Sequence, residues 1–434
     1  MNALLRRLIS EHGMILVLLL LGVFFSIVTL QEQSVSGDLA VSQVVDAAPQ
    51  GEGMIVTGPG PDDAAYAQAV EERLKSSGRR LAAAIKGSPA DVRTALVRHS
   101  ESGGQIQFVI ATAETARWLV LEELPKDFPK LGNPALLKPE TYRWPNFLKA
   151  DNLLNVANQI AVIAIIAIGM TMVIITGGID LSVGSLLALA AVLTSWFIRS
   201  QAGALEAGTG GMLLACLVGI AACGLAGAFS GLMITRFGIP PFIVTLAMML
   251  VTSGLAYTLS EGQSIYQIPD SFVWLGRGAD FINIPNAVLL MLLLYAVAHV
   301  VMTQMRIGRH LYAVGGNREA AHISGVPVDR VLMFAYVVSG LLAGLGGVVM
   351  ASQLKSGSPT YGGMYELYVI AAVVVGGSSL SGGKGTMLGT LTGAFIIAVI
   401  QNGMNLTNVE SYTQKVVLGG VILGAVLVDK IRRK

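Results

Sequence analysis

The chain carries little charge for its length. Only 13% of its 434 residues are Asp, Glu, Lys or Arg, against roughly 25% in an average soluble domain. Hydrophobic residues make up 53%, and the net charge is only +2. A nucleic-acid-binding protein usually has a strongly basic face, and a net charge of only +2 does not favour one. The composition therefore indicates a membrane protein with no nucleic-acid partner.

Cysteine is also scarce. The two cysteines, Cys216 and Cys223, both lie in one apolar run, which excludes a disulfide framework and a zinc site of the usual spacing. The five histidines lack metal-ligand spacing as well, so we expect no metal and no cofactor. Glycine, in contrast, reaches 51 residues, a composition that suits helices packed closely in lipid.

The charge that is present is concentrated in one segment. Residues 31–146 hold 15 of the 27 acidic and 12 of the 29 basic residues. This uneven distribution predicts a transmembrane helix within residues 1–30, a polar insertion with a Pro-rich linker over 31–146, and a membrane domain over 147–434.

The apolar runs predict an all-α polytopic membrane protein, because about 20 apolar residues span a bilayer as a helix. We expect about ten such helices, at 13–30, 153–175, 181–199, 211–234, 241–260, 285–303, 331–351, 366–380, 386–404 and 413–429. Arg6 and Arg7 before the first run would also fit a signal peptide. No small-x-small cleavage site follows, so we expect this helix to be retained.

Lysine and arginine in short loops predict the orientation. With a cytoplasmic N-terminus, the cytoplasmic loops receive Arg6, Arg7, Arg236, Arg306, Arg309, Arg318, Arg330, Lys384, Lys430, Arg432, Arg433 and Lys434. The opposite loops receive only Lys149, Arg199, Arg277, Lys355 and Lys415. We therefore expect both termini in the cytoplasm, residues 31–146 outside the cytoplasmic (inner) membrane, and the lipid bilayer as surroundings.

The insertion alternates strand-like and helix-like segments, which predicts a small parallel βαβαβ sheet. Strands are expected at 53–57, 80–85 and 106–111, and helices at 62–76, 89–100 and 112–121. Asp62 would cap the first helix, with Ala65, Ala69 and Leu74 on its apolar side. The turn over 58–61 could bind an anion at a helix N-terminus, but it lacks the full G-x-G-x-x-G pattern, which favours a tight connection. Residues 122–146 contain five prolines and predict a stiff linker.

One apolar run is interrupted by glycine and then by an acid. Gly177 and Gly178 break the segment IITGGIDLSVGS, and Asp180 and Ser182 follow. An ionisable residue in a membrane segment is a functional hypothesis by default, and transporters build their binding sites from broken helices. Asp180 and Ser182 can equally cap the next helix. These four residues are candidates for a translocation pathway, and both roles stay open.

The longest loop between spans, residues 304–330, predicts a short helix capped by Asn317 and ended by Gly325 and Pro327. Small and charged residues on a short exposed helix suit the groove of a partner protein. An ordinary solvated loop helix is the alternative.

These two segments together resemble permease subunits of ATP-binding-cassette importers, specifically the ribose/xylose/galactose sugar-permease family. GGIDLSVGS is a hallmark of that family, and Glu319, Ala320, Ala321 and Gly325 match its EAA-like loop. The resemblance extends through Ile239–Leu250 and Val373–Thr386 and covers 1–30 and about 144–434. It does not cover 31–143.

The resemblance implies the partners. The loop would dock on an ABC ATPase subunit as a coupling helix, through Arg318, Glu319, Ala320, Ala321 and Gly325. A second permease copy or a paralogue would complete the pathway, and an extracytoplasmic solute-binding protein would deliver a small molecule, most simply a monosaccharide. The insertion would contact that binding protein, cap the outer mouth, or be a tethered domain.

Catalysis by this chain is not expected. Gly376–Thr386 fails the phosphate-loop pattern, because Ser378 stands where glycine is needed and Gly385 where Ser or Thr is needed. The chain is therefore predicted not to be an enzyme. Glu366, beside three tyrosines, could anchor a span at the interface or face the solute, and it joins the candidate pathway residues.

Two other functional classes are compatible with parts of the sequence. An ion-coupled secondary transporter would need an intramembrane acid, for which Asp180 is the sole candidate, and no inverted repeat is visible. A membrane-anchored sensor or assembly protein, whose insertion binds a ligand or partner, is the main alternative.

Overall fold

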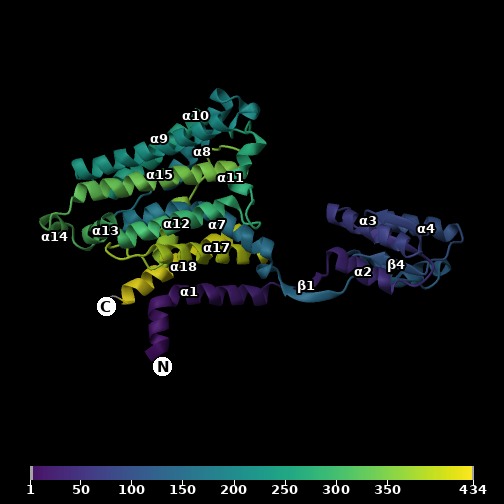
Figure 1. The fold of residues 1–434 in the computed structure, drawn as a ribbon. Helices are drawn as coiled ribbons and strands as arrows, with labels where there is room; N and C mark the ends of the chain where they lie inside the picture. The colour runs from purple at the N-terminus through teal and green to yellow at the C-terminus, as the bar shows by residue number, and fades with distance from the viewer. Residues whose placement is uncertain (1–2, 433–434) are drawn as a thin grey trace. The chain divides into compact units, whose positions relative to one another are not determined.

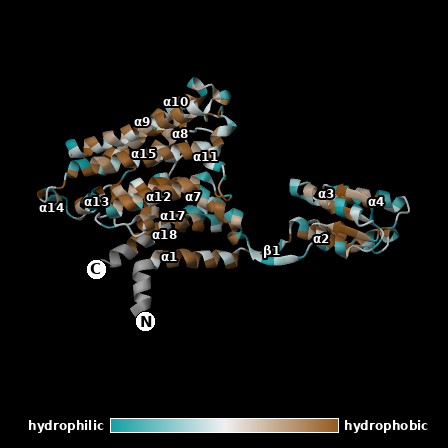
Figure 2. Ribbon diagram, in the orientation of Figure 1, coloured by the Kyte–Doolittle hydropathy of each residue, from teal (hydrophilic) through white to brown (hydrophobic). Residues whose placement is uncertain are grey.

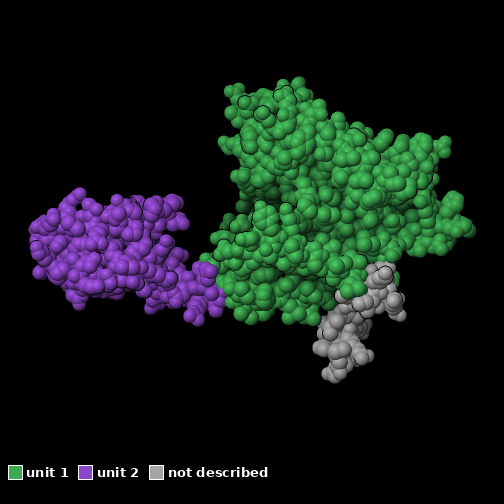
Figure 3. All heavy atoms as spheres, turned by 180° about the vertical axis from the view of Figure 1, so that it is seen from behind, with its two compact units in different colours: residues 1–29, 146–434 green, residues 30–145 purple. Residues whose placement is uncertain are grey.

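The computed structural model describes residues 3–432. The chain forms two compact units, residues 1–29 with 146–434 and residues 30–145 (Figure 3). Arg433 and Lys434, two of the basic residues expected on the cytoplasmic side, lie outside the described residues.

The first unit is helical (Figure 1). Its long helices are α1 (Ala3–Val28), α7 (Ala150–Ile175), α8 (Val183–Gln201), α9 (Thr209–Arg236), α10 (Pro241–Ser260), α12 (Asn286–Gln304), α15 (Val328–Leu354), α17 (Met387–Leu406) and α18 (Ser411–Arg432). The shorter ones are α11 (Trp274–Arg277), α13 (Arg306–Gly316), α14 (Arg318–Ile323) and α16 (Tyr365–Val375).

Within residues 3–432, seven helices are long and apolar enough to cross a membrane: α7, α8, α9, α10, α12, α15 and α17. Gly13–Val28 and α16 are shorter apolar helices. The hydropathy colouring of Figure 2 shows brown dominating these helices. The prediction of a mostly helical membrane protein is confirmed, whereas the predicted total of ten spans is not.

Helix α7 lies at the centre of this unit, where its most apolar window is 89% buried. Its Ile, Val and Ala side chains surround the whole helix, as expected for a helix packed on every side. Around it, α9 and α15 approach each other closely. A Cβ added at Gly227 of α9 would lie 2.3 Å from the Tyr336 carbonyl oxygen of α15. Glycine therefore permits the close helix contact that the composition suggested.

Helix α16 is shorter than the predicted span over 366–380. It ends at Val375, because Gly377 adopts a left-handed conformation (φ +89°) that stops a helix. At 1.5 Å per residue its 11 residues cover about 16 Å, roughly half of the hydrocarbon core.

The second unit is an α/β layer structure. Strands β2 (Glu52–Thr57), β3 (Arg80–Lys86), β4 (Phe108–Ala111) and β5 (Ala135–Leu137) form a parallel sheet in the order β3-β2-β4-β5. Helices α2 (Gly37–Ala47) and α3 (Pro61–Ser76) pack around Ile55 on one face. Helices α4 (Pro89–Glu101), α5 (Leu119–Glu122) and α6 (Leu124–Asp127) pack around Met54 and Val56 on the other.

Several expectations for this unit were wrong. Residues 112–121 do not form one helix, because Thr112 and Thr115 close a local turn in which each backbone N–H donates to the other's hydroxyl, at 3.0 and 3.2 Å. The stretch over 122–146 is not a linker, since it supplies β5 to the sheet. Helix α2 was missed, although Val41, Val44, Val45 and Ala48 have helical spacing.

The 58–61 turn is a tight connection. Helix α3 begins at Pro61, with Gly60 rather than Asp62 at the N-cap, and it buries Ala67, Val70 and Leu74 instead of Ala65 and Ala69. The Asp63 carboxylate lies 2.7 Å from the position of a Cβ added at Gly58. A carboxylate at this turn opposes anion binding.

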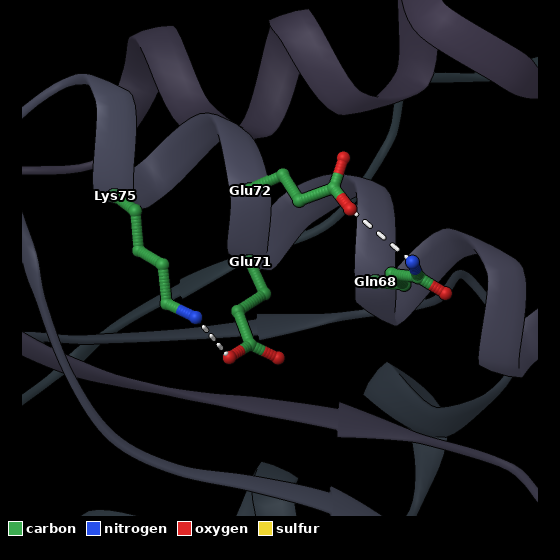
Figure 4. A network of polar contacts seen from close by, with 4 residues as sticks. All are labelled: Gln68, Glu71, Glu72 and Lys75. Carbon is green, nitrogen blue, oxygen red and sulfur yellow. Dashed lines mark hydrogen bonds and ion pairs between the residues drawn. The ribbon is translucent and has the colours of Figure 1, made fainter.

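Polar contacts on the outer side of α3 are simple surface pairs (Figure 4). Lys75 Nζ donates to Glu71 at 2.7 Å, and Gln68 donates to Glu72 at 3.2 Å. The hydrogen bond and charge of Lys75 lower the pKa of Glu71. Exposed pairs of this kind contribute little stability.

A two-stranded antiparallel ribbon closes the second unit. β1 (Leu30–Ser34) pairs with β6 (Thr141–Pro145). In the first unit, just beyond the ribbon, the Asn146 N–H donates to the Thr29 carbonyl oxygen at 2.9 Å. The chain therefore leaves and re-enters the helical unit at one point.

Candidate functional site

The break between α7 and α8 depends on its two glycines. Gly177 takes φ +80° and its N–H donates to the Ile174 carbonyl oxygen at 2.9 Å, which ends α7 as a left-handed C-terminal cap. A Cβ added at Gly178 would lie 2.4 Å from the Tyr336 hydroxyl. Only glycine fits both requirements.

Asp180 is 2% exposed and ties this break to α15. Its Oδ1 accepts from the Ser182 N–H at 3.0 Å and from the Ser182 hydroxyl at 2.6 Å. Its Oδ2 accepts from Ser339 of α15 at 2.8 Å. Three donors satisfy the buried carboxylate.

The predicted capping role needs correction. The Ser182 side chain makes no cap bond to α8, and Asp180 binds the N–H of Ser182 itself rather than an N–H of the first helical turn. Asp180 therefore shapes the turn before α8 and fastens it to α15.

An irregular segment, Lys355–Met364, runs along α8. A Cβ added at Gly357 would lie 2.5 Å from the Ala191 carbonyl oxygen, and one at Gly362 would lie 2.3 Å from the Gly184 carbonyl oxygen. The segment thus descends beside α8 for two turns without helix or strand structure beyond an isolated bridge to Ile265. At its end, α16 begins.

A pocket of about 320 Å³ lies along this segment. Its walls are α8, α10, residues 359–364 and Glu366. It is lined by Gly184, Ser185, Ala188, Met249, Leu250, Ser253, Tyr257, Pro359, Thr360, Tyr361, Gly362, Gly363, Met364 and Glu366. The Glu366 Oε2 lies 2.6 Å from a Cβ added at Gly184.

Of the five candidate pathway residues, only Glu366 lines this pocket. Gly177, Gly178, Asp180 and Ser182 lie in the break that precedes α8. Glu366 lies beside Gly184, near the start of α8. Ser253 and Tyr257 were missed, since nothing in an apolar helix marks its polar face toward a pocket.

The short helix predicted in the 304–330 loop is present as α14. The Ala320 N–H donates to the Asn317 side chain at 2.9 Å, as expected of the cap. Arg318, Glu319 and Ala320 are exposed, whereas Ala321 is 5% exposed. Gly325 takes φ +80°, which ends the helix without strain. Figure 1 shows α14 at one extremity of the helical unit.

The 304–330 loop is linked to the C-terminal end of α7 by the turn over residues 376–386. The Gly383 N–H donates to the Ile175 carbonyl oxygen at 2.8 Å, and the Tyr312 hydroxyl of α13 donates to the Gly385 carbonyl oxygen at 2.8 Å. Burial raises the pKa of Tyr312, so its hydroxyl stays protonated and donating. A Cβ added at Gly315 would lie only 1.7 Å from the Ile175 carbonyl oxygen.

Residues 3–432 contain no group of three His, Cys, Asp or Glu side chains placed to hold a metal. Cys223 is buried and donates to the Leu186 carbonyl oxygen at 3.2 Å, a packing role. The site thus consists of a broken helix, an irregular segment and a pocket lined by that segment, α8 and α10.

Comparison with known proteins decides the family. The family described as "Branched-chain amino acid transport system / permease component" matches residues 152–426. The chain belongs to this permease family. The permease is thereby a multi-pass protein of the inner membrane, and the inserted unit, residues 30–145, precedes the matched range.

Among curated proteins, the permease is 44% identical to the ribose import permease protein RbsC of Bacillus subtilis over 288 residues, 66% of this chain and 87% of that protein. It is 35% identical to the D-allose transport system permease protein AlsC of Escherichia coli, over 66% of this chain and 86% of the relative. It is 36% identical to the L-arabinose ABC transporter permease protein AraH of Azospirillum brasilense, over 67% of this chain and 83% of that protein. No solved structure matches.

Proposed function

We propose that this chain is the membrane-spanning subunit of an ATP-binding-cassette importer that moves a monosaccharide inward, while a separate subunit hydrolyses ATP. The main support for this proposal is the 44% identity to a ribose import permease across 87% of that protein. The permeases for allose and arabinose among the relatives support the same substrate class, since all three sugars are small, neutral monosaccharides rich in hydroxyl groups.

The coupling residues follow from the shape of the 304–330 loop. Helix α14 presents Arg318, Glu319 and Ala320 to solvent, Ala321 packs inward, and Gly325 lets the chain turn back into α15. These five residues would form the coupling loop, in which Arg318, Glu319 and Ala320 contact the ABC ATPase while Ala321 and Gly325 hold the helix in place, because an exposed short helix fits a groove on a partner.

The orientation of the permease in the membrane is inferred from the end of the helical unit at which its basic loop residues lie. The loop after α12 and the turn holding Lys384 meet through Tyr312 and Gly385, so their basic residues lie at one end of the unit. We therefore place both termini and this end in the cytoplasm and residues 31–146 outside. Ten membrane-embedded helices result when α1, α16 and α18 are added to the seven long spans, with α16 crossing only part of the bilayer.

The assembly would contain two permease copies, or this chain and a paralogue, two ATPase subunits and an extracytoplasmic solute-binding protein. Gly177, Gly178, Asp180, Ser182 and Glu366 would shape the pathway. The inserted unit would lie on the delivery face and contact the binding protein. Crosslinking from the exposed side of α3 in a transport-competent complex should capture that protein, and failure to do so would leave the unit as a tether.

A pull-down tests the central proposal. Intact protein and the variant Glu319→Lys with Gly325→Asp would be purified in mild detergent and their partners identified. We expect an ABC ATPase with the intact protein and a tenfold or greater loss with the variant. Glu206→Lys, an exposed charge reversal at the opposite end, is the matched control. Absence of any ATPase from all three, even after crosslinking in membranes, would favour the sensor or assembly class.

A further inference from the structure

We propose, on the basis that the chain is a sugar importer's permease, that the pocket between α8, α10 and residues 359–366 binds the transported monosaccharide part-way through the membrane domain. In this pocket Glu366 is the principal hydrogen-bond acceptor for sugar hydroxyls. The ligand class is a small uncharged polyol.

Helix lengths set the depth of the pocket. Gly184, beside Glu366, is separated from Gln201 at the end of α8 by about 26 Å at 1.5 Å per residue. The neighbouring break is joined through Asp180 to Ser339, about 16 Å from Val328 at the start of α15. The pocket floor therefore lies deep in the helical unit, far from the Gln201 end of α8 and from the Val328 end of α15.

Irregular backbone at that depth needs an explanation. In a membrane, non-helical backbone is tolerated where it is buried in protein or lines a water-filled cavity, and broken helices form substrate sites in transporters. Residues 359–364 are non-helical and line the pocket. Met364, a non-glycine residue, is held at φ +66° directly before α16. Strained backbone of this type clusters at functional sites.

The pocket offers free polar groups. Within the described part of the chain, the side chains of Ser253, Tyr257 and Glu366 hydrogen-bond to no other residue, whereas Ser185 is bonded to Thr252 at 2.7 Å. Their hydrogen-bonding capacity is available to a ligand. Apolar groups of Ala188, Met249 and Leu250 supply a surface for the C–H face of a sugar ring.

Charge selects among small solutes. Among the described residues, no Lys, Arg or His lines the pocket, so nothing there would pair with a phosphate group or with the carboxylate of an amino acid. Glu366 would repel a sugar phosphate. A neutral sugar is the solute that fits, and about 320 Å³ lies at the lower end of the range of small-molecule sites.

Glycine at position 184 positions the acceptor. A side chain there would meet the Gly362 carbonyl oxygen at 2.5 Å and the Glu366 carboxylate at 2.6 Å. Gly184 is thus a positioning residue that lets the irregular segment and α16 reach α8.

The test uses the full complex with its ATPase and binding protein in vesicles, in a Cys216→Ala background. Ser253→Cys would be labelled with a membrane-impermeant thiol reagent with and without D-ribose, D-allose, L-arabinose or L-leucine. Leu255→Cys, 53% exposed on another side of α10, is the matched control. We expect the imported sugar to slow labelling at least threefold at position 253 only, and L-leucine to have no effect.

Uptake kinetics provide the second readout. Glu366→Gln should raise the KM for the imported sugar at least tenfold while leaving ATPase copurification unchanged. Glu261→Gln, exposed just beyond α10, should leave KM unchanged. If the intact complex imports a sugar but position 253 is unprotected and Glu366→Gln behaves like its control, the pocket assignment is wrong and the importer stands. If the intact complex imports none of the three sugars, both proposals fail.

Discussion

Asp180 shows how one buried carboxylate can organise a break in a membrane helix. It accepts three hydrogen bonds, two from Ser182 and one from Ser339, and these hold the turn between α7 and α8 against α15. Its burial is compatible with folding because these three hydrogen bonds satisfy the carboxylate. Glu366 differs, since it is half-buried and faces a pocket.

Removing the Asp180 carboxylate should therefore destabilise the helical unit. Asp180→Ala leaves the Ser182 N–H and two hydroxyls unpaired, a loss of about 2–5 kcal/mol. We expect the temperature at which half of the detergent-purified protein stays monodisperse to fall by roughly 5–10 °C. Asp151→Ala, at an exposed site in the first turn of α7, is the control. A fall of equal size in both variants would contradict the role assigned to Asp180.

At the scale of elements, α13, the 376–386 turn and the end of α7 form one contact chain. Tyr312 bonds Gly385, Gly383 bonds Ile175, and Gly315 lies against Ile175. This chain leads from the proposed ATPase contact to the broken helix. A displacement of the 304–330 loop would move the end of α7 as well, because closely packed backbone segments transmit strain to one another.

Adjacent glycines allow this link to be tested. Gly315→Ala places a methyl group 1.7 Å from the Ile175 carbonyl oxygen, whereas Gly316→Ala meets nothing within 4 Å. We expect Gly315→Ala to lower solute import per ATP hydrolysed at least fivefold, with ATPase binding retained through α14. Tyr312→Phe should act in the same direction but more weakly, since it removes one hydrogen bond. Equal coupling ratios for Gly315→Ala and Gly316→Ala would refute the link.

The differences between expected and observed elements also have physical causes. Hydropathy identified α16 as an apolar segment but not its length, because Gly377 ends it by backbone conformation rather than by polarity. Thr112 and Thr115 replaced a helix by a side-chain-bonded turn. Strand β5 was not predicted, because it has only three residues in a Pro-rich stretch and is stabilised by pairing with β4 rather than by its own sequence pattern.

At the scale of the whole molecule, the inserted unit is separable. It has its own two-sided core around the sheet, and its ends meet where Asn146 bonds Thr29. No residue of the matched range, 152–426, belongs to it.

Replacing Leu30–Pro145 by a short Gly-Ser turn should therefore leave the helical unit folded. We expect unchanged ATPase copurification and a thermal midpoint close to that of the full chain, because the connection between Thr29 and Asn146 is already closed. Sugar uptake with the binding protein present shows whether the unit takes part in delivery. Aggregation of the shortened protein, or loss of the ATPase, would show that the unit supports the membrane domain.

The sequence by itself determined the membrane class, the breaks at Gly177, Gly178 and Asp180, and the short helix after Asn317. Hydropathy, glycine and capping act locally, so they are visible in a linear pattern. Only the tertiary structure decided which distant residues meet: Ser339 with Asp180, Ile175 with Gly315, and Glu366 with Ser253 and Tyr257 around one pocket. Those encounters depend on how close two backbones can approach, and that is a property of packed helices rather than of any one of them.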